Sequence, residues 1–419
     1  MISYARRRAE SMRILSIDRF FDVVGGKERY VAEWAALMRE HGHTVHLFAT
    51  RPPGAPETPG TKFLPPAIET NARGPLRRMG EAARRMYNVQ ARDMLARMLD
   101  ERPVDIAHVH SIFHLSASVI DELRRRAIPI VWTLHDYHPI CPISILYVHD
   151  AVCEACRGGR FHNAILKRCS RGDVGISALN AGEAYLNRLR RTYQAASVFI
   201  APSRFVLDKF VDFGWSPSRL VHVPHFGPTR AWTAEPIPER GPIVFAGRLQ
   251  RQKGVHVLLD ALARLNLPID QELVVVGDGP ERSVLEAQAE RLMPGRVQFV
   301  GHQDYEGVRA WYRRSRFAVV PSVWYEVFGL SVVEPFAVGR PVIGSRIGGI
   351  PEVIEDGRSG LLVTPGDPVA LADAIDWLLS HPVEAAAMGA AARERAESAF
   401  GPGAHYNHLL RIYENALRR

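Results

Sequence analysis

Two glutamates stand eight positions apart in the stretch YEVFGLSVVE, where Phe328, Gly329 and Leu330 lie between Glu326 and Glu334. An ionised carboxylate accepts hydrogen bonds and suits the vicinal hydroxyls of a ribose or another sugar. The residues before the stretch predict a strand and those after it a helix, whose first backbone N–H groups favour a phosphate. The stretch therefore indicates a ligand with hydroxyl and phosphate groups, although capping glutamates at a helix start give the same pattern.

A glycine turn follows the first apolar run of each half of the chain. Gly25 and Gly26 form the turn of the first half, and Gly247 that of the second. Glycine lets the backbone approach a ligand closely, and the start of a following helix favours an anion. Arg248 and Lys253 add two cations after Gly247, which favours a diphosphate. Ordinary turn glycines and solvated cations remain the alternative.

Histidines end two further apolar runs, DIAHVH and IPIVWTLH. In a doubly wound sheet the carboxyl ends of the strands face the ligand-binding crevice. We therefore expect His110, His135 and Asp136 to contact a ligand. The alternative is that the histidines only cap the strand ends by hydrogen bonding.

All four cysteines of the chain lie between residues 141 and 169. Cys153 and Cys156 form a Cys-x2-Cys pair, which is typical of half of a structural zinc site, and Cys141 and Cys169 complete a set of four. The alternatives are free thiols and disulfides. Because the set follows Asp136 directly, we expect an insertion that shapes the neighbouring pocket.

The elements that position these residues follow from an alternation of apolar runs and helical patterns along most of the chain. This rhythm is typical of parallel sheets covered by helices. It stops at the stretch VPHFGPTRAWTAEPIPERGP and then restarts, which predicts two doubly wound Rossmann-like α/β domains facing across a cleft. The predicted segments are a first domain over 1–223 with the Cys-rich insertion near 141–169, a linker over 224–242, a second domain over 243–395, and a C-terminal helix over 396–419 that crosses back to the first domain.

Composition excludes several classes of protein. The chain has 419 residues, of which 47% are hydrophobic and 23% charged, which suits two globular cores. We expect neither secretion nor membrane spanning, because no apolar run approaches the roughly 20 residues that cross a bilayer. The net charge of +8 is concentrated in the first 200 residues, which carry 29 Lys and Arg against 20 Asp and Glu. No nucleic-acid recognition motif accompanies it, so an anionic membrane, a phosphate-bearing substrate or a solvated surface is expected instead.

Together, several motifs resemble glycosyltransferase family 4 over residues 13–415. The motifs are GGKERYVAEWAALMREHGHTVHLFAT, FAGRLQRQKG, LVVVGDGPE, FVGH, VVPSVWYEVFGLSVVEPFAVGRPVIGS and DGRSGLLVTPGDP. The resemblance implies the two-domain GT-B fold and a retaining, nucleotide-sugar-dependent glycosyltransferase. It also implies a bacterial, cytoplasmic enzyme of polysaccharide or glycolipid synthesis.

The resemblance implies a role for most of the candidate residues. Glu326 would meet the hydroxyls of the donor sugar, Glu334 the ribose, and Arg248 and Lys253 the diphosphate. The backbone of Gly25, Gly26 and residues 328–330 would lie in close contact with the diphosphate. Gly247, Gly277 and Gly301 would lie along the nucleotide. His135 matches a strand-end histidine of the family and is therefore favoured as a contact to the acceptor or the donor sugar. His110 and Asp136 are expected at the same place because they also follow strand ends.

Two positions depart from the family pattern. Pro335 follows Glu334 where alanine is usual, and a proline removes a helical hydrogen bond, at a cost of up to about 3 kcal/mol inside a helix. His225 stands in a hinge sequence, VPHFGP, where Val-Pro-Asn-Gly is usual, so its role stays open.

A catalytic metal is not expected, because the chain has no Asp-x-Asp pair to hold one on a diphosphate. Arg248, Lys253 and the helix start would stabilise the leaving group instead. A sugar-nucleotide epimerase, a phosphorylase or another GT-B enzyme remains the alternative function. A nicotinamide-dependent oxidoreductase is not favoured, because neither half carries Gly-x-Gly-x-x-Gly after its first strand.

The segment PLRRMGEAARRMYNVQARDMLARMLDE predicts a basic amphipathic helix. Its arginines are Arg77, Arg78, Arg84, Arg85, Arg92 and Arg97. Such a helix can lie on anionic lipid, which would attach the enzyme to the cytoplasmic face of a membrane. A plain solvated helix is the alternative.

Overall fold

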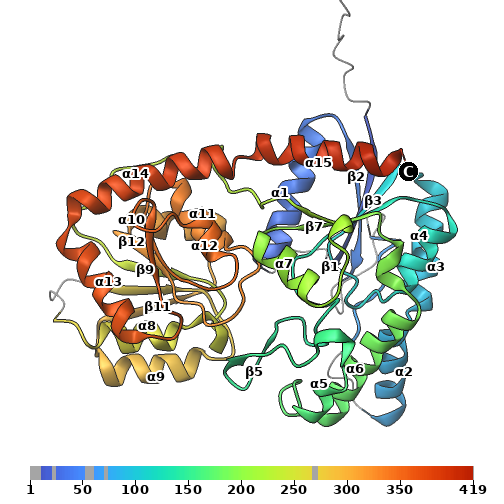
Figure 1. The fold of residues 1–419 in the computed structure, drawn as a ribbon, viewed down its shortest axis with the longest axis horizontal. Coiled ribbons are helices and arrows are strands. Elements are labelled where there is room, and N and C mark those ends of the chain that lie inside the picture. Colours follow the sequence, from blue (N-terminus) through green and yellow to red (C-terminus); the bar gives the residue numbers. More distant parts are fainter. Residues whose placement is uncertain (1–10, 21–24, 52–60, 70–73, 267–271, 419) are drawn as a thin grey trace, which may run out of the picture.

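The computed structural model describes residues 11–20, 25–51, 61–69, 74–266 and 272–418, and it contains two six-stranded parallel sheets (Figure 1). The first sheet has the order β2-β1-β3-β4-β7-β8. Its strands are β1 (Arg13–Phe20), β2 (Thr44–Thr50), β3 (Ile106–Val109), β4 (Ile130–Thr133), β7 (Val198–Ala201) and β8 (Leu220–His222). This confirms the first predicted Rossmann-like sheet.

The second sheet has the order β11-β10-β9-β12-β13-β14, so its first strand lies in the middle and the chain winds outward in both directions. Its strands are β9 (Ile243–Ala246), β10 (Leu273–Val276), β11 (Val297–Gly301), β12 (Phe317–Val320), β13 (Val342–Ser345) and β14 (Gly360–Val363). A separate antiparallel hairpin, β5 (Tyr147–Val148) and β6 (Ala151–Val152), belongs to the Cys-rich insertion. The predicted fold class is confirmed.

Helices cover both sheets. Those of the first half are α1 (Gly26–Glu40), α2 (Pro75–Met86), α3 (Val89–Glu101), α4 (Ser118–Arg125), α5 (Asn163–Leu166), α6 (Val174–Leu189) and α7 (Arg204–Asp212). Those of the second half are α8 (Val255–Leu262), α9 (Arg282–Leu292), α10 (Tyr305–Arg314), α11 (Leu330–Ala337), α12 (Ile350–Val353), α13 (Pro368–Ser380), α14 (Pro382–Ala399) and α15 (Pro402–Leu417). None of the helices in these described ranges is both long and apolar enough to cross a lipid bilayer.

Most of the central strands are rich in apolar residues because both faces of each sheet are covered. In β1, Leu15 and Ile17 enter one core cluster while Ile14 enters the cluster on the opposite face. In β9, Phe245 and Val244 divide between two clusters in the same way. Successive side chains of a strand point to opposite faces, so a strand that is buried on both faces carries no polar alternation. The sheets are therefore rigid platforms for the residues at their ends.

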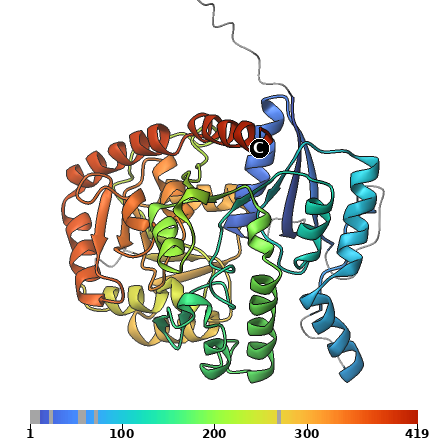
Figure 2. The same ribbon diagram turned by 45° about the vertical axis from the view of Figure 1, so that its right-hand side comes forward.

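The C-terminal helix α15 lies against the first half of the chain (Figure 1). Tyr406, Leu409 and Tyr413 are buried in one cluster with Trp34 of α1. Tyr413 also shares a hydrogen bond of 2.6 Å with His108 of β3. Figure 2 shows from a second side how α14 and α15 run from the second half across to the first.

The arginine-rich segment forms two helices, which corrects the prediction of one amphipathic helix. Helix α2 ends at Met86, Tyr87 is extended with φ −155°, and the Asn88 side chain caps α3 by accepting from the Ala91 N–H at 3.0 Å. Helix α3 is amphipathic toward the core, where Leu95 is buried. Helix α2 instead exposes the large apolar side chains Leu76 and Met79 beside its arginines.

Candidate functional site

The topology places ligand crevices at two points. In each sheet the winding direction reverses, between β1 and β3 in the first sheet and between β9 and β12 in the second. In open α/β sheets the crevice beyond the carboxyl ends of such strands binds ligands. Gly25 follows β1 and His110 follows β3, while Gly247 follows β9 and Glu326 follows β12. The residues predicted from sequence therefore gather at the two switch points.

Glu326 is buried and forms an ion pair with Lys253. The Lys253 Nζ atom lies 2.6 Å from Glu326 Oε1, and the Ser322 hydroxyl donates to the same oxygen at 2.7 Å. Burial raises the pKa of Glu326, but Lys253 and the hydrogen bonds outweigh it and the pKa is lowered overall. The site therefore contains a buried, ionised carboxylate beside a cation.

Glycines hold the Glu326 loop in place, and the sequence analysis missed them. The Gly349 N–H donates to the Glu326 carbonyl at 2.7 Å, and a Cβ atom on Gly348 would lie 2.4 Å from the Glu326 nitrogen. Gly254 has φ +75°, and a Cβ atom there would lie 1.8 Å from the Pro321 carbonyl oxygen. The signal was present in the pairs GG and KG, but the partners of these glycines are distant in sequence.

Helix α11 begins at Leu330, and Gly329 precedes it with φ +117°. A Cβ atom on Gly26 would lie 3.8 Å from Leu330 Cδ1, so the first residues of α1 and α11 adjoin across the two halves of the chain. Both helix starts carry backbone N–H groups without an intrahelical partner and a partial positive charge. Pro335 lies in the second turn of α11, where it removes one helical hydrogen bond.

Glu334 lies half-buried on α11 and has a different electrostatic environment from Glu326. Burial raises its pKa to about 7, the charge of Arg29 opposes this shift, and Glu33 adds to it. Both Arg29 and Glu33 come from α1. The Arg29 guanidinium lies 3.7 Å from the ring centroid of Tyr305, so this group also joins the two halves.

The predicted glycines of the second half lie in backbone contact with one another. The Gly247 N–H donates to the Val276 carbonyl at 3.0 Å, and the Gly277 N–H donates to the Gly301 carbonyl at 2.8 Å. A Cβ atom on Gly277, whose φ is +131°, would lie 2.0 Å from the Gly247 carbonyl oxygen. Arg248 is exposed. The pKa of Arg19 in the first half is lowered mainly by burial, and the positive charge of Arg248 lowers it as well.

The predicted acceptor-side histidines form a cluster. His110 Nδ1 and His135 Nε2 share a hydrogen bond of 3.0 Å, and the His135 ring stacks on His225 with centroids 5.0 Å apart. Burial, reinforced by the neighbouring histidines, lowers the pKa of all three well below 6.5, so they are neutral. The His225 ring also meets the Phe328 ring edge-on, with centroids 5.4 Å apart, so the segment around His225 contacts the loop that follows β12.

Lys27 and Asp18 are polar residues of the first crevice that the sequence analysis missed. The Lys27 Nζ atom lies 2.6 Å from Asp18 Oδ1, and Asp18 Oδ2 is buried with no hydrogen-bond partner among the described residues. A cation directly after Gly25 and Gly26 was the available signal. Asp136 lies nearby, where its Oδ1 atom accepts from the His138 N–H at 2.8 Å.

All four cysteines are free thiols in the structure, so it contains none of the alternative disulfides. Burial raises the pKa of Cys156 to about 12, and the charges of Cys141, Cys169 and Cys153 contribute, so the four thiols are neighbours. Within the described ranges, however, no group of three or more metal-ligating side chains has an arrangement that could hold an ion. These residues as placed do not fit the expected zinc site, and the zinc stays a prediction.

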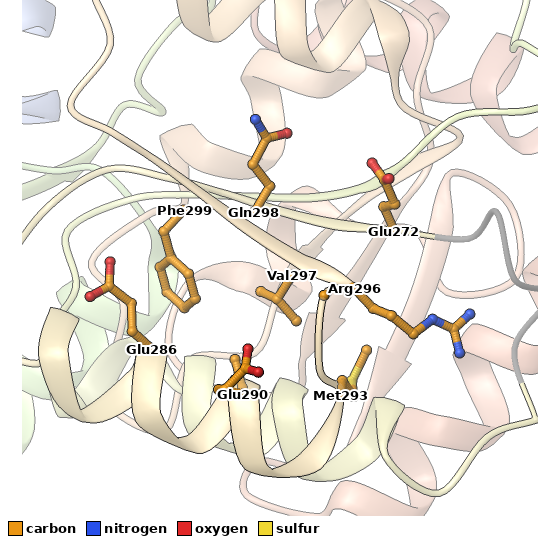
Figure 3. Close-up of a pocket in the computed structure, with 10 residues that line it drawn as sticks. Glu272, Glu286, Glu290, Met293, Arg296, Val297, Gln298 and Phe299 are labelled. Atoms are coloured by element: carbon orange, nitrogen blue, oxygen red, sulfur yellow. The ribbon is translucent and has the colours of Figure 1, made fainter.

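A cavity of about 550 Å³ lies elsewhere, between α9 and the β11 edge (Figure 3). Glu286, Glu290 and Phe299 line it, together with Met293 at the end of α9. None of the predicted site residues lines it. It is not part of the switch-point site.

Comparison with known protein families covers nearly the whole chain. A model described as "Glycosyltransferase Family 4" matches residues 24–227, and one described as "Glycosyl transferases group 1" matches residues 234–395. The chain belongs to glycosyltransferase family 4.

Two curated relatives align with this glycosyltransferase over most of its length. A phosphatidyl-myo-inositol mannosyltransferase from Mycobacterium leprae is 28% identical over 94% of each chain. A D-inositol 3-phosphate glycosyltransferase from Catenulispora acidiphila is 29% identical over 94% of this chain and 91% of the relative.

Solved structures support the GT-B fold. Sucrose-phosphate synthase from Thermosynechococcus elongatus has a TM-score of 0.71 at 21% identity and covers 96% of this chain, with 98% of its own chain matched. HepE from Anabaena, solved in complex with UDP-glucose, has a TM-score of 0.67 at 19% identity, covering 96% of this chain and 100% of its own. At these identities the likeness concerns the fold alone.

Proposed function

We propose that this glycosyltransferase moves a sugar from a nucleoside-diphosphate sugar to an acceptor hydroxyl with retention of configuration. The observation that carries the proposal is the convergence of two anion-binding helix starts, at Gly26 and Leu330, with the ion pair of Lys253 and Glu326. Gly26, Lys253 and the segment from Glu326 to Leu330 come from distant parts of the chain, so the fold brings them together. A phosphate-bearing sugar is the ligand class that matches this set.

In the proposed complex the diphosphate lies between the starts of α1 and α11, and Arg248 and Lys253 face it. Glu326 accepts hydrogen bonds from the sugar, and Glu334 accepts them from the ribose. Lys253 thus lies between the Glu326 carboxylate, which binds the sugar hydroxyls, and the phosphate group that leaves with the nucleotide. This position lets one cation respond to charge that develops on the leaving oxygen.

The acceptor would enter from the first crevice, where His135 and His110 lie. As a neutral, hydrogen-bonded pair these rings can orient a hydroxyl without carrying charge. The departing diphosphate takes the proton of the acceptor as the hydroxyl attacks the same face of the sugar. This route needs neither a protein nucleophile nor a bound metal, since the two cations and two helix starts stabilise the leaving group.

The relatives suggest where the product belongs. One is named for mannosyl transfer to phosphatidyl-myo-inositol and another for glycosyl transfer to inositol 3-phosphate, while HepE was solved with UDP-glucose. We therefore propose a hexosyl donor, an acceptor in glycolipid or cell-surface glycan synthesis, and a place in the cytoplasm of a bacterium.

Peripheral contact with a membrane is part of this proposal. Leu76 and Met79 of α2 are 83% and 68% exposed, and Leu166 of α5 is 74% exposed. Lys167 and Arg168 are also exposed, and no ion pair joins either of them to another described residue. Figures 1 and 2 show α2, α5 and α6 at the end of the molecule opposite α15. Apolar side chains beside unpaired cations suit an anionic lipid surface.

The test is incubation of the protein with a panel of labelled nucleoside-diphosphate sugars in the presence of EDTA. The proposal predicts slow hydrolysis of one panel member to free sugar and nucleoside diphosphate, at a rate that EDTA leaves unchanged. An epimerase would instead change the configuration of the sugar while it stays on the nucleotide. If EDTA abolishes the activity, the proposal of a metal-free site is wrong. If no panel member releases sugar, the proposal of a glycosyltransferase activity on these donors is wrong.

A further inference from the structure

The Cys-rich insertion contacts both loops of the proposed donor site. From the insertion, Glu154 Oε1 accepts a hydrogen bond of 3.0 Å from the Tyr325 hydroxyl, and Tyr325 immediately precedes Glu326. Asp150 Oδ2 lies 3.6 Å from Arg251 Nε, two positions before Lys253. Figure 1 shows the β5 hairpin reaching from the first half toward the second. The insertion thus connects the first domain to the residues around the Lys253 and Glu326 pair.

Glu154 is the centre of the stronger of these two contacts. The same oxygen that accepts from Tyr325 also accepts from Lys209 Nζ at 2.7 Å. Lys209 in turn lies 5.0 Å from the centroid of the Tyr325 ring, and Phe205 packs on that ring at 4.9 Å. Burial raises the pKa of Glu154, but the interactions with Lys209 and Tyr325 outweigh burial. The pKa is therefore lowered overall, and the carboxylate is ionised. A charged acceptor makes these hydrogen bonds stronger than neutral ones.

The backbone on either side of Tyr325 is held by both halves of the chain. The Tyr137 hydroxyl donates to the Tyr325 carbonyl at 3.1 Å, and the Ser203 hydroxyl donates to the Val327 carbonyl at 2.7 Å. Gly349 fixes the Glu326 carbonyl from the second half. The first half thus holds the backbone on both sides of Glu326, while the second half holds its carbonyl and, through Lys253 and Ser322, its carboxylate.

We propose that Glu154 is a positioning residue for the donor site: it anchors Tyr325 to the insertion and so orients Glu326 toward the donor sugar. This inference rests on the proposed function, because it assigns Glu326 to that sugar. It also gives the Cys-rich insertion a role on the donor side, where the sequence had suggested a pocket for the acceptor.

The first test is a double-mutant cycle with Glu154→Gln, Tyr325→Phe and the double variant. Tyr325→Phe removes the donor of this hydrogen bond, whereas Glu154→Gln keeps an acceptor oxygen but removes its charge, so both variants weaken the same contact. We expect each to raise the donor KM by about 3- to 10-fold with a smaller change in kcat. The donor KM of the double variant should be no higher than that of the single variant with the higher KM. This is because the effects of substitutions at contacting residues are not additive. The assay uses the panel member that the wild-type chain hydrolyses fastest.

Glu101→Gln is the matched control. Glu101 accepts from Lys62 Nζ at 2.6 Å on the surface, as Glu154 accepts from Lys209, but it lies on α3 away from the donor loop. It should leave the donor KM unchanged. Additive effects of Glu154→Gln and Tyr325→Phe, or equal effects of Glu154→Gln and Glu101→Gln, would overturn the inference, because they indicate a contribution to folding only.

The second test needs no sugar nucleotide. Hydrogen exchange of residues 323–329 should be faster in Glu154→Gln than in the wild-type chain, with other segments unchanged. If exchange is faster but the protein hydrolyses no panel member, the proposed function is wrong, whereas the result still supports the statement that Glu154 anchors the loop. Unchanged exchange and an unchanged KM in an active enzyme would overturn the inference while leaving the proposed function intact.

Discussion

At the scale of single residues, the carboxylates of Glu326 and Glu334 differ in charge state. Glu326 is kept ionised by Lys253 and Ser322, whereas burial raises the pKa of Glu334 to about 7. One carboxylate is thus fixed as an anion and the other titrates near neutrality. Their proposed roles, one on the sugar and the other on the ribose, can be separated by substitution and by pH.

Glu326→Gln tests the role of Glu326 on the sugar. The amide keeps the shape but weakens the hydrogen bonds to the sugar and leaves Lys253 without its anion. We expect kcat/KM for sugar release to fall about 10- to 100-fold, while the free nucleoside diphosphate binds at least as tightly as before. Calorimetry and initial rates measure the two effects. Equal losses in nucleotide binding and in sugar release would contradict the assignment.

The pKa of Glu334 predicts a pH dependence of donor binding. In the proposed complex the ribose hydroxyls donate to the Glu334 carboxylate, so donor binding favours the ionised form, and protonation competes with the donor below about pH 7. The donor KM should therefore rise as the pH falls from 8 to 6 and stay level above 8. In Glu334→Gln the KM should be higher and independent of pH over this range. The same slope in both proteins would assign the titration to another group.

At the scale of elements, the main feature is the approach of α1 to α11 at their first residues. Alanine is a better helix former than glycine, and a Cβ atom on Gly26 would make only an ordinary contact with Leu330. The fold therefore tolerates alanine at this position. A diphosphate that lies between the two helix starts does not, because the methyl group would occupy part of its space.

Gly26→Ala should accordingly keep or slightly raise the melting temperature while raising the donor KM about 10-fold, which corresponds to about 1.4 kcal/mol. Gly80→Ala is the control, because Gly80 lies inside α2 with no atom near the position of a new Cβ. It should raise stability without changing the KM. If Gly26→Ala and Gly80→Ala behave alike in both measurements, the diphosphate does not lie at the start of α1.

The elements also show how far the sequence could lead. Short apolar runs predicted the strands, and the run that ends at Ser322 followed by a helical pattern predicted the loop of Glu326 and the helix after it, because both are local patterns. Glu154 was not found, because its partner Tyr325 is 171 positions away. The break at Tyr87 was also missed, since helical spacing continues through it and only the Asn88 cap reveals the second helix.

At the scale of the whole molecule, one end of the first half carries exposed cations beside an exposed apolar side chain. Helices α2, α5 and α6 form one end of the molecule, with Lys167, Arg168 and Arg171 exposed near Leu166. By contrast, Arg77 and Arg85 of α2 form ion pairs with Glu69 and Glu183. The loop after α5 is therefore a stronger candidate for lipid contact than most of the arginines on α2.

Sedimentation with vesicles tests this surface. The protein should bind vesicles that contain anionic lipid at low salt and detach at 1 M salt, where screening acts over about 3 Å. Reversing the charges of Lys167, Arg168 and Arg171 should remove most of the binding. Reversing Arg264 and Arg291 of the second half should not. Binding that ignores salt and lipid charge, or equal losses in both variants, would contradict the attachment.

The central claim, transfer from a nucleoside-diphosphate sugar with retention, is tested most directly by following the reaction by proton NMR. With an α-linked donor, the account predicts that the α-anomer of the sugar appears first and mutarotates later, and that Glu326→Gln slows this at least about 10-fold. First appearance of the β-anomer, or an undiminished rate in Glu326→Gln, would contradict it.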